Sequence, residues 1–246
     1  MRGRWLSFAA LALVLPACHR TPDGKLDGKA TAQPKAFGAG LVEMGGGLQA
    51  ASVGTVLDQP LVVQVNDAQG SPVKGALVTF RAAGETILTP SSGLTGDDGQ
   101  LSVTCQLGSS AGRYQILAAT TDKSGKSVTL RLEEIALGYQ QNLGRQLSDR
   151  YCSRCHDPES SAERVSNYDN LTVKPHTFTD GAFLNSVSDT DLAAITTYGG
   201  AARSKSAEMP SYGGTLSKTD IEALVAYIRA VASPPYRARG LIYASE

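Results

Sequence analysis

The stretch that most limits what this chain can fold into reads YCSRCHDPES, at residues 151–160. Cys152 and Cys155 are three positions apart, and His156 directly follows the second cysteine. Three such groups can form a disulfide, bind a zinc ion or hold a covalently attached haem. The fold has to suit whichever of these occurs, so the rest of the sequence must decide between the three chemistries.

The composition sets the class of protein before any further motif does. With 246 residues, of which 41% are hydrophobic, the chain can bury the core of one large domain or of two ordinary ones. Its 23 Lys and Arg residues equal its 23 Asp and Glu residues, and only 6% of residues are aromatic. This balance gives no electrostatic footprint for nucleic acid and no polybasic face for an anionic membrane, so we predict no nucleic-acid partner.

The N-terminus predicts export. It reads MRGRWLSFAALALVLPAC, with two arginines, an apolar run from Trp5 to Leu15 and a small residue before Cys18. This is the pattern of a secretory signal peptide, and the apolar run is too short to span a bilayer. We therefore expect residues 1–17 to be removed from the mature protein.

The segment from Leu15 to Cys18 resembles the lipobox of bacterial lipoproteins. The resemblance implies that Cys18 is acylated, becomes the first mature residue and anchors the protein to a lipid bilayer. In that family an aspartate after the cysteine retains the protein in the inner membrane, whereas here His19 follows. The expected location is the outer membrane of a Gram-negative bacterium, facing the periplasm or the cell surface. The alternative is an ordinary signal peptide with a coincidental cysteine.

Residues 18–38 are predicted to form a flexible tether. They are rich in Pro, Gly, Lys, Asp and Thr and contain almost no large apolar side chain. Such a composition cannot bury enough surface to offset the entropy that is lost on ordering. The expected role of this segment is to let the folded part of the protein extend away from its anchor.

Residues 39–136 show the alternation of apolar and polar side chains that is typical of half-buried β-strands. The intervening stretches NDAQGSPVKG, TGDDGQ and TDKSGKS carry the residues that turns require. We therefore predict an antiparallel β-sandwich. The residues expected to face its core are Leu61, Val63, Val65, Ala76, Val78, Phe80, Leu101, Val103, Cys105, Leu107, Tyr114, Ile116, Ala118, Val128, Leu130 and Leu132.

The strands and turns in PLVVQVNDAQGSPVKGALVTF, TGDDGQLSVT and AGRYQILA resemble the bacterial immunoglobulin-like modules of the invasin and intimin adhesins. The resemblance rests on turns and alternation, so it implies a fold more strongly than a function. Cys105 is expected to be a buried free thiol that packs as a small hydrophobe. Asp97 and Asp98 precede a glycine and are interpreted as part of a hairpin turn, with calcium ligands as the alternative.

Cys152 and Cys155 are then the sulfurs left to share one site. A structural zinc site needs four ligands, and this region adds only His156 and His176. A redox dithiol of the thioredoxin type lies at a strand-to-helix junction, and no βαβ pattern surrounds this one. In an exported protein, C-x-x-C-H instead indicates c-type haem attachment, in which the thiols add to the two vinyl groups and His156 ligates the iron.

A haem iron that only shuttles electrons is held from both faces, so a second ligand should follow on an extended segment. Met209 is the only methionine after residue 44. Pro210 follows it and prevents a helix from forming through this position. Met209 is therefore the predicted second ligand.

Two capped helices are predicted on either side of Met209. The first follows Ser188, with Asp191 three residues on, and ends at a pair of glycines. The second follows Ser217, with Asp220 three residues on, and ends before two prolines. Its apolar stripe consists of Ile221, Leu224, Val225, Ile228 and Val231.

From Gly138 to Ala232 the chain resembles a class I cytochrome c, with an attachment-motif helix, a middle helix, a Met-Pro loop and a closing helix. The resemblance implies an all-α cytochrome c domain over residues 137–232. It also implies one covalently attached haem c whose iron is ligated by His156 and Met209.

The same resemblance assigns supporting roles to three other residues. Gly144 in the first helix is expected to pack against Tyr227 in the last. Pro175 is expected to supply the carbonyl oxygen to which the Nδ1–H of His156 donates. His176 is the rival iron ligand, although it would fall on the side of His156 if the family pattern holds.

The expected architecture has two domains, an all-β immunoglobulin-like sandwich over residues 39–136 and an all-α cytochrome c domain over residues 137–232, with an unassigned tail at 233–246. The expected function is that of a membrane-anchored electron carrier, not an enzyme. It would transfer single electrons between redox partner proteins, with the sandwich as a spacer or docking module.

Two other functions remain open. A haem-based sensor or small-ligand binder would leave one face of the iron free. An adhesin-like interaction protein would use the sandwich to bind its partner and keep the haem as an accessory. A peroxidase-like enzyme is disfavoured, because no distal acid–base group is identified.

Overall fold

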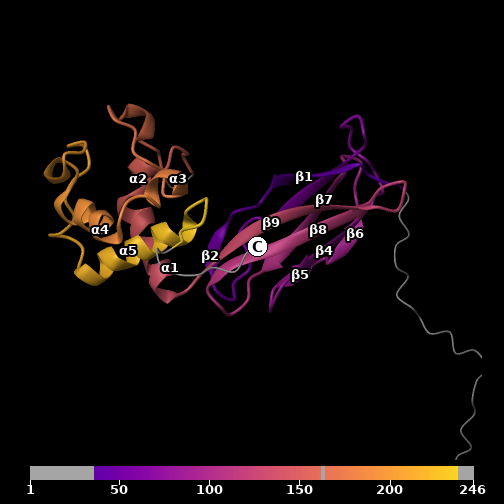
Figure 1. Cartoon of the computed structure of the whole chain (residues 1–246), viewed down its shortest axis with the longest axis horizontal. Coiled ribbons are helices and arrows are strands. Elements are labelled where there is room, and N and C mark those ends of the chain that lie inside the picture. The colour runs from indigo at the N-terminus through magenta and orange to yellow at the C-terminus, as the bar shows by residue number, and fades with distance from the viewer. Residues whose placement is uncertain (1–35, 162–163, 238–246) are drawn as a thin grey trace, which may run out of the picture. The chain divides into compact units, whose positions relative to one another are not determined.

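The computed structural model describes residues 36–161 and 164–237. The predicted signal peptide, the lipidation site Cys18 and the tether up to residue 35 lie outside the described residues, as does the tail beyond residue 237. A β-sandwich over residues 40–137 is followed by a helical domain over residues 139–231 (Figure 1). The predicted order of an all-β domain and then an all-α domain is therefore confirmed.

The sandwich consists of two sheets packed on one apolar core. One sheet has the strand order β1-β3-β7-β5 and the other has the order β2-β9-β8-β4-β6. Neighbouring strands are antiparallel, except that β2 and β9 run parallel. The strands are β1 (Gly40–Gly45), β2 (Ala50–Ser52), β3 (Leu61–Asn66), β4 (Leu77–Ala82), β5 (Ile87–Thr89), β6 (Ser92–Leu94), β7 (Gln100–Gln106), β8 (Gly112–Thr121) and β9 (Ser127–Leu137).

The alternation seen in the sequence determines which side of each strand is buried. Successive side chains of a strand point to opposite faces, so every second apolar residue reaches the space between the sheets. Most predicted core residues are fully or almost fully buried there, and Leu101, Tyr114 and Leu130 pack against them while partly buried. The buried residues from this prediction are Leu61, Val63, Val65, Ala76, Val78, Phe80, Val103, Cys105, Leu107, Ile116, Ala118 and Leu132.

Two smaller predictions for the sandwich are also confirmed. Cys105 is fully buried as a free thiol, and burial, followed by the nearby charge of Glu134, raises its pKa to about 11. In TGDDGQ, the carboxylate of Asp98 accepts a hydrogen bond from the backbone N–H of Gln100 at 3.0 Å, and Gly99 has a φ of +72°. This is a turn conformation that favours glycine.

Glu134 is a buried acid that the sequence prediction missed. Alternation from Leu130 and Leu132 places it on the inward face of β9, where its side chain is fully buried. Its Oε2 accepts the backbone N–H of Gln49 at 2.8 Å, whereas its Oε1 has no hydrogen-bond partner within the described residues. Burial raises the pKa of this carboxyl to about 8, despite the opposing hydrogen bond from Gln49.

The sandwich should consequently become less stable as the pH rises. The folded-state pKa of Glu134 lies above its value of about 4.5 in the unfolded chain, so the folded protein holds a proton that the unfolded protein releases. Stability is greatest near or below pH 4.5 as far as this group is concerned and falls through pH 8. The free energy of unfolding should drop by on the order of 4 kcal/mol between pH 5 and pH 9.

This pH dependence can be measured by urea unfolding followed by far-UV circular dichroism. Glu134→Gln keeps an oxygen for the Gln49 N–H but cannot ionise, so it should remove most of the loss above pH 6. Asp97→Asn, which removes an exposed carboxylate of a sandwich turn, is the matched control. If Glu134→Gln loses as much stability between pH 5 and pH 9 as the unmodified chain, Glu134 is not the titrating group.

The helical domain begins one residue after β9. Its helices are α1 (Tyr139–Tyr151), α2 (Ser153–His156), α3 (Gly181–Leu184), α4 (Asp189–Tyr198) and α5 (Lys218–Val231), with short 3₁₀ turns η1 (Tyr168–Asn170) and η2 (Ala201–Arg203). None of the helices in the described part of the chain is both long and apolar enough to cross a membrane.

The caps predicted for two of these helices are present. The hydroxyl of Ser188 accepts the backbone N–H of Asp191 at 3.0 Å and starts α4. The hydroxyl of Ser217 accepts the backbone N–H of Asp220 at 3.2 Å, and the Asp220 carboxylate accepts the Ser217 N–H in return, which completes a capping box at α5. The predicted stripe of α5 is buried, and it comprises Ile221, Leu224, Val225, Ile228 and Val231.

The first and last helices cross in close contact at Gly144, as predicted. A Cβ atom added to Gly144 would lie 2.0 Å from the carbonyl oxygen of Ala223 and 2.7 Å from the Cβ of Tyr227. Only a residue without a side chain allows the two backbones to approach this closely. The crossing fixes the C-terminal half of α1, and with it the cysteine motif that follows.

Candidate functional site

The cysteine motif forms a compact helical turn at the end of α1. The backbone N–H of Cys152 donates to the carbonyl of Ser148 at 2.8 Å and so closes that helix. The N–H groups of Cys155 and His156 then both donate to the carbonyl of Cys152, at 3.0 and 2.9 Å. This turn holds the two cysteines and the histidine in one short segment. Both cysteines are free thiols, so the disulfide alternative is not observed.

Cys152 is directed into an apolar cluster formed by Leu216, Ile221 and Leu224, next to Tyr212. Burial, followed by the proximity of Cys155 and then of Asp149, raises the pKa of its thiol to about 12. A redox-active dithiol works as a thiolate, which such burial disfavours. Within residues 36–161 and 164–237, no three His, Cys, Asp or Glu side chains gather to hold a metal ion.

His156 is oriented by a single hydrogen bond. Its Nδ1 lies 2.8 Å from the carbonyl oxygen of His176, and because a carbonyl can only accept, Nδ1 carries the proton. The opposite nitrogen, Nε2, therefore keeps its lone pair for a metal. Burial lowers the pKa of His156, against the effect of the hydrogen bond, and favours the neutral imidazole that metal ligation requires. The ring packs on Phe178, with 4.8 Å between the centroids.

The predicted acceptor of this hydrogen bond was wrong by one residue. The class I resemblance implied that Pro175 supplies the carbonyl, but the oxygen belongs to His176. Carbonyl directions change from one residue to the next along an extended segment, so counting along the chain locates the segment and not the oxygen.

His176 itself lies on the Nδ1 side of His156, as the resemblance implied for the rival ligand. Its own Nδ1–H donates to the carboxylate of Asp180 at 2.7 Å, and its ring stacks on Phe183 with 3.6 Å between centroids. The His176 side chain therefore interacts with Asp180 and Phe183, while the carbonyl of the same residue accepts the hydrogen bond from His156.

Met209 lies half-buried on an irregular loop between η2 and α5. The backbone N–H of Gly200 donates to the Met209 carbonyl at 3.0 Å, and the Met209 N–H donates to Ser206 at 3.3 Å. Gly199 has a φ of +82°, and a Cβ at Gly200 would lie 2.1 Å from the Ser206 carbonyl oxygen. The glycine pair that ends α4 therefore also holds the loop that carries Met209.

Two side chains beside Met209 tie this loop to the rest of the site, and the sequence prediction missed both. The carboxylate of Glu208 accepts the backbone N–H of Thr172 at 3.1 Å. The hydroxyl of Tyr212 donates to the carbonyl of Tyr151 at 2.8 Å, directly before the cysteine motif. Their only sequence signal was their position within three residues of Met209.

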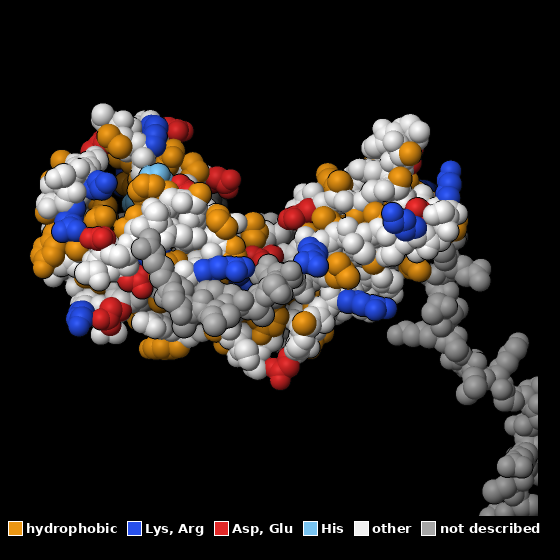
Figure 2. Space-filling model, viewed as in Figure 1, with side chains coloured by type: hydrophobic (Ala, Val, Ile, Leu, Met, Phe, Trp, Pro, Cys, Tyr) orange, Lys and Arg blue, Asp and Glu red, His pale blue; other side chains and the backbone are white. Residues whose placement is uncertain are grey.

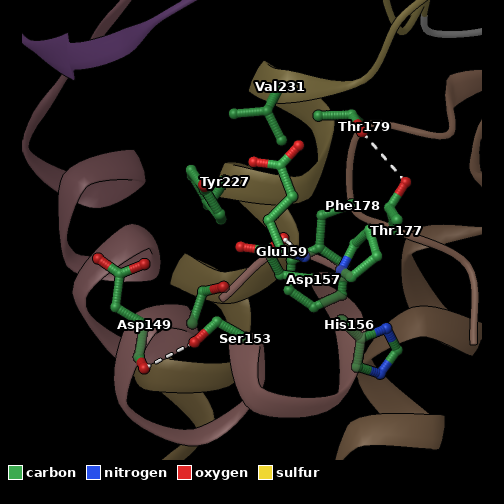
Figure 3. Close-up of a pocket in the computed structure, with 12 residues that line it drawn as sticks. Asp149, Ser153, His156, Asp157, Glu159, Thr177, Phe178, Thr179, Tyr227 and Val231 are labelled. Carbon is green, nitrogen blue, oxygen red and sulfur yellow. Dashed lines mark hydrogen bonds between the residues drawn. The ribbon is translucent and has the colours of Figure 1, made fainter. Parts of the chain in front are cut away.

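A cavity of about 310 Å³ lies beside His156. Figure 3 shows His156 at its edge, with Thr177, Phe178 and Thr179 from the segment before α3, and Tyr227 from α5. The imidazole of His156 therefore has the cavity on one side and the ring of Phe178 beside it.

The residues at this site fit a covalently attached haem. Two free thiols three residues apart suit its two vinyl groups, and a neutral imidazole whose Nδ1 is already hydrogen-bonded suits one face of the iron. A half-buried thioether on an anchored loop would suit a second iron ligand. This donor set suits a c-type haem better than a zinc ion, which needs four ligands.

Basic and acidic side chains are interspersed over the face of the helical domain seen in Figure 2. This agrees with the equal numbers of basic and acidic residues in the sequence.

Two family models match the chain. Residues 58–132 match the bacterial Ig-like domain (group 1), and residues 140–228 match the model described as cytochrome C oxidase, cbb3-type, subunit III. The first of these segments is thus similar to bacterial Ig-like domains, and the second is similar to a family of c-type cytochromes. A comparison with curated proteins gives no match.

Among solved structures, the D00-D0 domain of intimin is similar to this chain with 17% sequence identity and a TM-score of 0.31, over 44% of this chain and 51% of that one. The adhesin InvE of Yersinia pseudotuberculosis is similar with 14% identity and a TM-score of 0.30, over 40% of this chain and 32% of that one. The chain spans about half the length of the intimin structure. Similarity at this level carries no argument about function.

Proposed function

We propose that this chain is an exported monohaem c-type cytochrome that transfers single electrons between redox partner proteins. The observation that supports it best is the motif turn, where two free thiols precede an imidazole whose Nδ1 already donates to the His176 carbonyl. The match of residues 140–228 to a cytochrome family supports the same proposal.

The side chains divide the work as follows. Cys152 and Cys155 hold the cofactor covalently, so it cannot dissociate in an exported protein. A haem bound in this way supplies reversible one-electron chemistry at its iron. His156 would ligate through Nε2 and Met209 through its sulfur, and a thioether raises the potential relative to a second histidine. Apolar clusters on α4 and α5 exclude water from the interior, which disfavours the more highly charged ferric form.

The attachment to a membrane belongs to the same proposal. The lipobox at Leu15 to Cys18 supports acylation of Cys18 and anchoring in the outer membrane of a Gram-negative bacterium. On that anchor, the tether and the Ig-like domain would act as a spacer or docking module that brings the cytochrome domain to its partners. The redox partners are proteins, and the chain itself is not an enzyme.

Protein-film voltammetry of the purified full chain tests this function. A single reversible wave of one electron per chain is expected, and carbon monoxide should leave the wave unchanged because Met209 occupies the second face of the iron. A haem sensor with a free iron face would instead show a wave that moves when carbon monoxide is added. That outcome, or haem-loaded protein without a reversible wave, would contradict electron transfer as the function.

A further inference from the structure

We propose that Asp180 is a positioning residue for the iron ligand and acts on it through the side chain of His176. The inference rests on the proposed function, because it concerns how His156 is held toward a haem. Nothing in the C-x-x-C-H motif or in the Met-Pro loop points to Asp180, which follows His156 by 24 positions.

The carboxylate of Asp180 holds two parts of the chain at once. Its Oδ2 accepts the Nδ1–H of His176 at 2.7 Å, and its Oδ1 accepts the backbone N–H of Phe183 at 3.2 Å. The ring of Phe183 in turn stacks on the ring of His176 at an interplanar angle of 6°. The His176 side chain is thereby fixed on one edge and on one face, although it is 46% exposed.

Holding this side chain restricts the movement of the backbone to which it is attached, and with it the carbonyl of the same residue. That carbonyl is the acceptor for the Nδ1–H of His156, at 2.8 Å. The connection from Asp180 to the predicted iron ligand therefore consists of two hydrogen bonds and one residue.

The segment from His176 to Gly181 is fixed at its C-terminal end by the backbone that follows α5. The N–H of Ser233 donates to Thr179 at 2.9 Å, and the N–H of Gly181 donates to Ser233 at 3.0 Å. A Cβ at Gly181 would lie 2.3 Å from the carbonyl oxygen of Pro234, so the contact is close. Asp180 thus lies next to firmly held backbone, and its carboxylate reaches back to His176, four residues earlier in the chain.

In the stretch between these two points, Phe178 packs against the apolar cluster of α3, α4 and α5 and against the ring of His156. Thr177, Phe178 and Thr179 line the cavity of about 310 Å³ beside His156 (Figure 3). Where a wall faces a cavity, the dispersion contacts that would restrain it are missing on that side. The bond between Asp180 and His176 therefore takes over part of the restraint that a filled core would provide.

The consequence for the iron ligand has a definite direction. A carbonyl that accepts from Nδ1 makes the imidazole a better electron donor at Nε2. A better donor stabilises the ferric form and lowers the potential. Releasing the His176 carbonyl should therefore raise the midpoint potential and let the Nδ1 proton exchange faster with solvent.

The test compares Asp180→Ala and His176→Ala in the full haem-loaded chain. Each variant removes one side of the bond, and only Asp180→Ala also removes the cap at Phe183. Both should raise the midpoint potential. Both should also speed solvent exchange of the His156 Nδ1 proton, measured by NMR, about tenfold, which corresponds to about 1.4 kcal/mol. The double variant should shift neither quantity beyond the single variants, because both act through one bond.

Two controls separate positioning from a loss of stability. Ser188→Ala removes the N-cap of α4 and should lower the melting temperature without moving the potential or the proton exchange. Asp180→Asn keeps an acceptor oxygen for His176 and should stay close to the unmodified chain in both readouts.

Unchanged potential and exchange in His176→Ala would overturn the inference, even if Asp180→Ala fails to fold. An equal shift in Ser188→Ala would overturn it as well, since the effect would then follow stability. An unmodified chain that binds no covalent haem would contradict the proposed function instead, so the two failures are distinguishable.

Discussion

Replacing Cys152 and Cys155 together by alanine should abolish covalent haem attachment completely. Each thioether bond needs one of these thiols, and the remaining described cysteine, Cys105, is fully buried in the sandwich. Denaturing electrophoresis with haem staining should show colour at the mass of the mature chain and none for the double variant. Cys105→Ala is the matched control and should keep the stain.

The same double variant should lose the fold of the helical domain. Its apolar clusters are small, with four buried residues in one and three in another, and much of their side-chain volume comes from α5. A core of this size is marginal without the group that it encloses, so haem binding and folding should be coupled. Far-UV circular dichroism should retain the β-sheet signal and lose most of the helical signal. Covalent haem in the double variant would contradict the attachment at these cysteines. An unchanged helical signal in a double variant that lacks haem would contradict the coupling.

Replacing Met209 by alanine should lower the midpoint potential by a sizeable part of the roughly 0.8 V range that axial ligands control. The loop should stay in place, because Gly200, Ser206 and the side chains of Glu208 and Tyr212 hold it without using the Met209 side chain. The substitution therefore removes the thioether and little else. The weak near-infrared charge-transfer band of thioether-bound ferric haem should disappear at the same time.

Met209→His provides the complementary test. It should restore a closed, low-spin site at a lower potential than the unmodified chain, since imidazole donates more strongly than a thioether. Met44→Ala is the control, because Met44 is exposed in the sandwich. An unaltered potential and near-infrared band in Met209→Ala would exclude Met209 as a ligand.

Side-chain patterns made most of the fold predictable. Alternation in LVVQV and LSVTCQL reports directly which side chains are buried, and Leu61, Val63 and Val65 are fully buried as expected. Serine caps followed three residues later by aspartate gave the starts of α4 and α5, because the capping hydrogen bonds are local in sequence.

Backbone and long-range contacts were harder to predict. The His176 carbonyl was assigned to Pro175, because a sequence shows side chains and not the direction of a carbonyl. Glu134 was overlooked, although alternation places it inside, because a carboxylate normally marks a solvent-facing position. The Asp180–His176 bond depends on how the chain turns before α3, and spacing alone does not specify this turn.

The most direct test of the account is the optical spectrum of the purified, reduced full chain before and after the addition of carbon monoxide. With His156 and Met209 as the two axial ligands, the ferrous protein should be low-spin and should not change on addition of the gas. A high-spin ferrous spectrum with immediate uptake of carbon monoxide would contradict the proposed electron carrier and indicate a ligand-binding haem protein instead.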